Sequence, residues 1–137
     1  MRSATLGLTL LLLLAGSAFA DEARAPEHKI TQSESYRMLE PMYATVINGD
    51  KPSGTLMVAI GLDIPNVALR KDADRAMPIL RDAYVRSLMV YAWSHVRPWI
   101  QPDVVEIAAR LQKVTDTTLR KPGARVLLAQ VMVRITK

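Results

Sequence analysis

A few residues of this chain are of types that could do chemistry. They are two histidines, a serine beside one of them, and a lysine between two glycines. Neither His28 nor His95 has a second histidine or a carboxylate at metal-ligand spacing, so no metal site is predicted. Ser94 and His95 are sequence neighbours. A nucleophile and its base are assembled across a fold, so this adjacency is not evidence of catalysis.

The remaining chemical signals are weaker still. Gly49 and Gly54 flank Lys51 but lack the strand-loop-helix context and the Lys-Ser/Thr ending of a phosphate-binding loop, so both glycines are assigned to turns. The chain contains no cysteine, which removes disulfides, thiolate metal sites and cysteine nucleophiles. We therefore expect no catalytic residue, no cofactor and no metal, and a protein that is not an enzyme.

Length and composition indicate one domain. The chain has 137 residues, half of them apolar, which is enough to build a packed core without covalent staples. The formal net charge of +5 comes from scattered basic residues, and aromatics make up only 5%, so nucleic acid is not an expected partner. A solvated basic face is the simpler interpretation of these charges, and weak attraction to anionic lipid headgroups is the alternative.

The N-terminus has the pattern of a secretory signal. Arg2 precedes an apolar stretch over 6–15, and Ala18-Phe19-Ala20 offers small residues at the two positions that a signal peptidase reads. Cleavage after Ala20 predicts a periplasmic protein. The alternative is a retained anchor, because the uncharged stretch 3–20 is near the lower limit of roughly 17 residues for a bilayer span. We expect a signal peptide over 1–20, a flexible arm over 21–35 and a folded domain over 36–137.

One amphipathic helix is expected to organise that domain, within Asp72 to His95. Its apolar stripe recurs at spacings of three or four and consists of Met77, Leu80, Tyr84, Leu88 and Tyr91. Asp72 or Asp74 is expected to cap it. Pro78 predicts that the helix starts near Met77 or bends there.

A second helix is expected from Asp103, where Asp103 and Glu106 form a capping box, to Pro122-Gly123. Strands are expected over 36–47, interrupted by Pro41, and over 55–62, joined by turn residues from Asn48 to Gly54.

The last strand, over 125–135, is expected to place Leu127, Ala129, Val131, Val133 and Ile135 on one face and Val126, Leu128, Gln130 and Met132 on the other. A strand apolar on nearly both faces belongs inside a sheet or against a partner. The expected fold is α+β, with a small sheet of three strands or slightly more, β-β-α-α-β order and two helices on one face.

Three segments in this order resemble a known family. Tyr36 with Leu39, Glu40 and Pro41 resembles an opening Tyr-x-x-Leu-x-Pro strand, 78–82 resembles an Ile-Arg-Asp-like helix step, and 126–134 resembles a closing Val-x-x-Val-x-Phe-type strand. Over roughly 36–134 the chain is similar to the flagellar basal body-associated FliL proteins, whose periplasmic domain resembles the stomatin fold.

The resemblance implies a non-enzymatic periplasmic module that self-associates, in the family as a ring around the stator units of the flagellar motor. It implies an interaction role for Arg81 and Asp82, by match to the helix step. Tyr91, Trp93 and Trp99 form the one aromatic group of the sequence, to be interpreted as core and interfacial packing or as a partner-binding surface. The alternatives are a peripheral envelope or membrane-surface protein, and a small hydrolase or ligand-binding protein.

Overall fold

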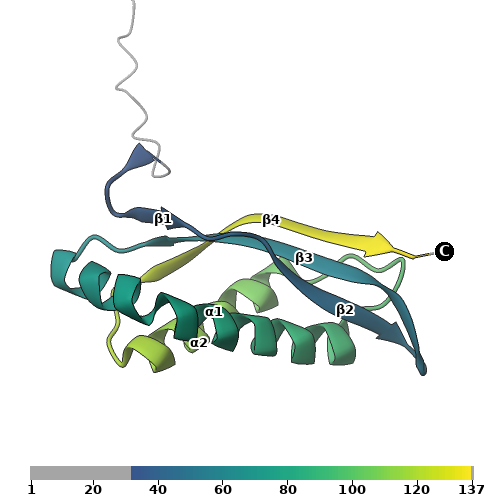
Figure 1. Cartoon of the computed structure of the whole chain (residues 1–137). Coiled ribbons are helices and arrows are strands. Elements are labelled where there is room, and N and C mark those ends of the chain that lie inside the picture. The colour runs from purple at the N-terminus through teal and green to yellow at the C-terminus, as the bar shows by residue number, and fades with distance from the viewer. Residues whose placement is uncertain (1–31, 137) are drawn as a thin grey trace, which may run out of the picture.

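A long central strand, β3 (Lys51–Asp63), organises the computed structural model, which describes residues 32–136 (Figure 1). The other elements, in chain order, are β1 (Tyr36–Met38), β2 (Met42–Asn48), α1 (Val67–His95), α2 (Val104–Leu119) and β4 (Arg125–Ile135). Within the described residues the chain is an α+β protein with a small antiparallel sheet of four strands and two helices. The expected signal peptide, and the expected arm up to residue 31, lie outside this range.

The sheet has three rows, because β1 and β2 lie end to end along the same edge of β3. β4 pairs with Gly54–Asp63 along one edge of β3. β1 and β2 pair with residues of the same stretch, so both must lie along the opposite edge. The Leu39 amide donates to the Ile60 carbonyl at 3.0 Å and bridges the gap between β1 and β2. The single first strand expected from the sequence is therefore two segments, separated at Pro41, which has no amide hydrogen to offer the ladder.

The turn between β2 and β3 is shorter than the stretch from Asn48 to Gly54 predicted. Asn48 pairs directly with Lys51, which leaves Gly49 and Asp50 as the connection, and Gly49 adopts a left-handed φ of 64°. Ser53 is the extra residue of a bulge and donates its hydroxyl to the Val46 carbonyl at 3.2 Å. The turn-forming residues between Asn48 and Gly54 therefore form both a tight turn and the bulged start of β3.

Both helices pack on the same face of the sheet (Figure 1). The alternation predicted for the second strand is confirmed, since Leu56, Val58, Ile60 and Leu62 are all fully buried. They form one core with buried side chains of both helices, principally Leu69, Leu80, Tyr84, Leu88, Tyr91, Ile107 and Leu111. Burial of this apolar surface is the main force holding the helices to the sheet.

The first helix begins earlier than expected. Its N-cap is Asn66, whose side chain accepts the Leu69 amide at 2.9 Å, so the predicted caps Asp72 and Asp74 lie inside the helix. The buried stripe extends back through Ala73 to Leu69, and the helix continues without a break through Pro78. An interior proline costs about 3 kcal/mol, and burial of the stripe on both sides of it offsets that cost.

The second helix confirms half of its predicted capping box. The Asp103 carboxylate accepts the amides of Val105 and Glu106 at 2.9 and 3.0 Å. The reciprocal bond from Glu106 to the Asp103 amide is absent from the described structure, because the Tyr91 hydroxyl takes that amide at 3.1 Å. The cap is thereby tied to the first helix as well as to its own.

The face assignment predicted for the last strand is wrong in its first half. Gln130 pairs with Ala59 and Leu128 pairs with Ile60, so Ala129 is an extra residue in a β-bulge. The bulge shifts the alternation by one, which puts Val126 and Leu128 on the helix side together with Val131, Val133 and Ile135. The strand is also at the edge of the sheet, since β3 is its one strand neighbour in the described structure.

Candidate functional site

The two residues predicted from the helix step, Arg81 and Asp82, make ion pairs within the chain. Arg81 Nη1 lies 2.9 Å from Glu40 Oε2, which links α1 to the connection between β1 and β2. Asp82 accepts from Arg86 one turn further along the helix. Such exposed pairs contribute roughly 0.2–1 kcal/mol each, so both residues remain accessible to a partner at small cost.

Tyr91 is separated from the two tryptophans with which the sequence grouped it. It is 2% exposed, its ring stacks on His95 with centroids 5.2 Å apart, and burial raises the pKa of its hydroxyl. The Arg110 guanidinium lies 5.5 Å from the ring centroid. Arg110 Nε is the one buried side-chain polar atom of the described residues without a hydrogen-bond partner. Tyr91 therefore joins the two helices from within the core.

Trp93 and Trp99, by contrast, lie outside the core. Their exposed fractions are 67% and 84%, and Trp99 adopts a φ of 71°, which turns the chain between the two helices. Further exposed apolar side chains surround them in sequence, so that seven of the twelve large exposed hydrophobics of the described residues fall between 89 and 105. We call Trp93, Trp99, Ile100, Val104 and Val105 the apolar tip. Large exposed apolar patches typically mark interaction sites.

Ser94 and His95 are hydrogen-bonded in a way that sequence adjacency did not predict. Ser94 Oγ lies 2.6 Å from His95 Nδ1 and donates its one hydrogen to the Val90 carbonyl at 2.7 Å. His95 Nδ1 must then be the donor to Ser94. His95 Nε2 faces Glu106 Oε1 at 3.7 Å. This arrangement orients the ring, but it leaves Nδ1 unable to accept the serine proton.

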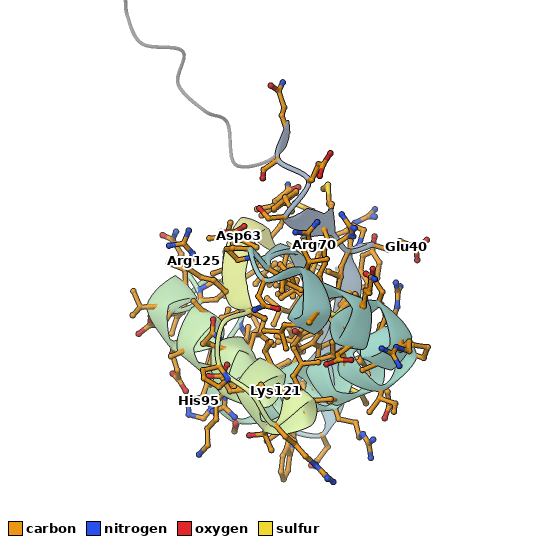
Figure 2. The ribbon with its side chains drawn as sticks, turned by 90° about the vertical axis from the view of Figure 1, so that its left-hand side faces the viewer. Glu40, Asp63, Arg70, His95, Lys121 and Arg125 are labelled. Atoms are coloured by element: carbon orange, nitrogen blue, oxygen red, sulfur yellow. The ribbon has the colours of Figure 1, made fainter. Side chains whose placement is uncertain are left out.

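A polar cluster at the other end of β3 is a feature that the sequence analysis missed. Asp63 is 8% exposed and accepts from Ser35 Oγ at 2.7 Å and from Arg125 Nη2 at 3.1 Å. Figure 2 shows Asp63 and Arg125 beside each other on the same side of the molecule. Ser35 belonged to the predicted flexible arm, yet its carbonyl also accepts the Ile64 amide at 2.9 Å. The cluster anchors the entry of the chain to the sheet.

A cavity of about 580 Å³ lies beside this cluster and is lined by Asp63, Pro65, Gln112, Asp116, Pro122, Gly123, Ala124 and Arg125. Its polar groups already have partners. Gln112 Nε2 donates to Asp116 and to the Ala124 carbonyl, and Gln112 Oε1 accepts the Val126 amide at 2.9 Å. These groups join α2 to the start of β4 instead of converging on a ligand.

A buried hydroxyl pair joins the two helices near the middle of the core. Tyr84 Oη and Thr115 Oγ1 lie 2.6 Å apart, and Thr115 also donates to the Leu111 carbonyl at 2.8 Å. Because a hydroxyl has one hydrogen, Tyr84 is the donor of this pair. Burial raises the pKa of the Tyr84 hydroxyl, so the neutral donor is the favoured form.

Within residues 32–136, no group of three or more histidine, cysteine or acidic side chains is placed to hold a metal ion. None of the helices described has both the length and the apolar character to span a bilayer.

These features define a small α+β module whose two helices cover one face of the sheet and which has an exposed apolar tip. Comparison with protein-family models found no match, and neither did comparison with curated proteins.

Proposed function

We propose that this chain is a non-enzymatic periplasmic interaction module of the FliL-like kind, with a stomatin-like domain that self-associates and supports the flagellar stator. The motif order of the sequence supports the family assignment. The observation that carries self-association is the open edge of β4, a strand of eleven residues with one neighbour in the described structure. An unpaired strand edge is a template for pairing with another chain.

The two halves of this edge differ. In the first half, Gln112 of α2 accepts the Val126 amide, and the bulge at Ala129 interrupts the regular ladder. Both features protect an edge from pairing. The second half, over 130–135, has neither feature, so it is the part of the strand available to a second copy.

The hydrogen-bonding direction of this half follows from its last contact. The Thr136 amide donates to the Ser53 carbonyl at 3.0 Å, so Thr136 points toward β3. Bonding direction alternates along an antiparallel ladder. The amides and carbonyls of Val131, Val133 and Ile135 therefore point away from β3, and two copies related by a two-fold axis could pair them antiparallel.

Substitution Val133→Pro should prevent this pairing and keep the fold, at some cost in stability because Val133 packs partly against the core. The substitution removes an amide that points away from β3, and edge strands tolerate proline at such positions. We expect the chain to shift from oligomer to monomer in size-exclusion chromatography with light scattering, with an unchanged circular dichroism spectrum. The matched variant Met132→Pro removes an amide directed at β3 and should instead destabilise the monomer. An unaltered chain that is monomeric at all accessible concentrations would contradict self-association.

The motor role has its own test. Deleting the gene should reduce swimming speed in viscous medium, because stator engagement limits torque under load, and complementation with the Val133→Pro variant should fail to restore it. Complementation with unaltered protein is the control. Unchanged motility after deletion would contradict the motor role. The light-scattering result would then be evidence for self-association alone.

A further inference from the structure

We propose that the apolar tip docks this protein onto an anionic phospholipid surface. The inference concerns a different surface from the β4 edge and goes beyond the proposed function. The tip brings together the end of α1, the connection over 96–103 and the first turn of α2. Figure 1 shows this connection at the same end of the molecule as the hairpin between β2 and β3, opposite β1.

The side chains of the tip suit the boundary between water and lipid. Trp93 and Trp99 are exposed, and neither indole N–H has an acceptor among the described residues. Tryptophan is enriched at headgroup depth, where its ring meets apolar chains and its N–H meets polar groups. Ile100 and Val105, exposed by 63% and 75%, add aliphatic surface. Each of these side chains is in contact with water in the free protein.

Cations without a carboxylate partner flank the tip. Arg97 donates to the backbone carbonyls of Trp93 and Val96, and Lys51 lies in the adjacent hairpin. Neither forms an ion pair with a carboxylate of the described residues. Asp50 is the neighbouring carboxylate of the hairpin, whereas the Asp103 carboxylate is occupied by two helix amides. Arg97 and Lys51 can therefore contact anionic headgroups, although the carboxylates of Asp50 and Asp103 also lie in this region.

A cavity of about 400 Å³ lies where Arg97 and Trp93 meet the hairpin between β2 and β3. It is lined by Ile47, Gly49, Trp93, Ser94 and Arg97. The Arg97 guanidinium can contact a phosphate group, while the tryptophan and isoleucine suit the glycerol and upper acyl region. A lipid headgroup combines these two chemistries in one molecule. The need for an anionic group and an apolar group in one ligand is the argument for a lipid over a protein partner.

The backbone limits how deeply the tip can enter. The connection over 96–103 is not helical. The amides of Ile100 and Asp103 are bonded within the protein, but backbone groups without such partners would be unpaired in hydrocarbon. Pro98 and Pro102 remove two of those donors and stiffen the connection. The tip should therefore sit at headgroup depth, with the rest of the molecule in water.

Intrinsic fluorescence tests the proposal, because Trp93 and Trp99 are the two tryptophans of the chain. The purified full chain without its predicted signal is mixed with phosphatidylcholine vesicles, with or without phosphatidylglycerol. We expect a blue shift of the emission, quenching by brominated acyl chains and co-sedimentation, all strongest with phosphatidylglycerol. Ile100→Asp should lower the partition coefficient about tenfold or more, and Arg97→Gln about fivefold.

Matched controls separate the tip from general stickiness. Ile79 on α1 is exposed by the same 63% as Ile100, so Ile79→Asp should bind vesicles as the unaltered chain does. Arg120→Gln removes a cation at the other end of α2 and should also have no effect. Absence of both blue shift and sedimentation with anionic vesicles overturns the proposal. Equal weakening by Ile79→Asp and Ile100→Asp does so too, as would tip variants that change the oligomeric state and leave vesicle binding unaltered.

Discussion

Leu80→Asp is expected to lower the free energy of unfolding by roughly 4 kcal/mol or more, because it places an unpaired carboxylate in the core. Leu80 is 0% exposed and belongs to the cluster that joins α1 to the sheet. A domain of this size is stable by about 5–15 kcal/mol, so a single such change removes a large share of the total. Urea denaturation followed by circular dichroism measures the loss.

The adjacent residue provides the control for this experiment. Ile79 is 63% exposed, so Ile79→Asp should change stability by about 0.5 kcal/mol or less. The two variants introduce the same charge one residue apart on the same helix. Similar unfolding midpoints for both would show that the buried stripe of α1 is misplaced.

Gly54→Ala is expected to cost about 2 kcal/mol, because a rigid backbone occupies the space that the methyl group needs. A Cβ atom at residue 54 would lie 2.5 Å from the Arg134 carbonyl oxygen and 3.3 Å from the Ile135 Cα. β3 and β4 would have to move apart where they pair. The unfolding midpoint in urea should fall, and hydrogen exchange should accelerate in the last residues of β4 before the rest of the sheet.

Gly61→Ala is the matched comparison, since the obstacle there is a side chain. A Cβ atom at residue 61 would meet the outer ring atoms of Tyr36, which lies across the strand on β1. The ring can rotate away, so the expected loss is below about 1 kcal/mol. Removing the ring with Tyr36→Ala should make Gly61→Ala close to neutral. A larger loss at Gly61 than at Gly54 would contradict the close packing of β4 on β3.

The elements that the sequence predicted well are those with a local physical signal. The stripe through Leu80 and Tyr84 repeats at helical spacing, and the strand through Leu56 and Val58 alternates strictly. The period of each segment therefore indicates its secondary structure. The Asp103 cap and the stop before Pro122 are also local. The fold class follows from these signals because two amphipathic helices need an apolar sheet face to cover.

The predictions that failed depended on contacts between distant residues. Pro78 is compatible with a helix start or a helix interior, and burial of Leu69 and Ala73 on the sheet decided for the interior. The bulge at Ala129 leaves no local sign in an apolar strand, yet it reverses the facing of the residues before it. Local propensity cannot decide such cases, because the competing local structures differ by less than the packing energy.

The candidate surfaces divide in the same way. The order of residues is enough to establish that Trp93 and Trp99 stand close to Tyr91 along the chain, and that 125–135 is an apolar strand. It took the folded arrangement to establish that Tyr91 turns into the core while both tryptophans face solvent, and that β4 ends the sheet with one open edge. Exposure depends on what covers a side chain or a strand edge, and that cover comes from segments far away in the sequence.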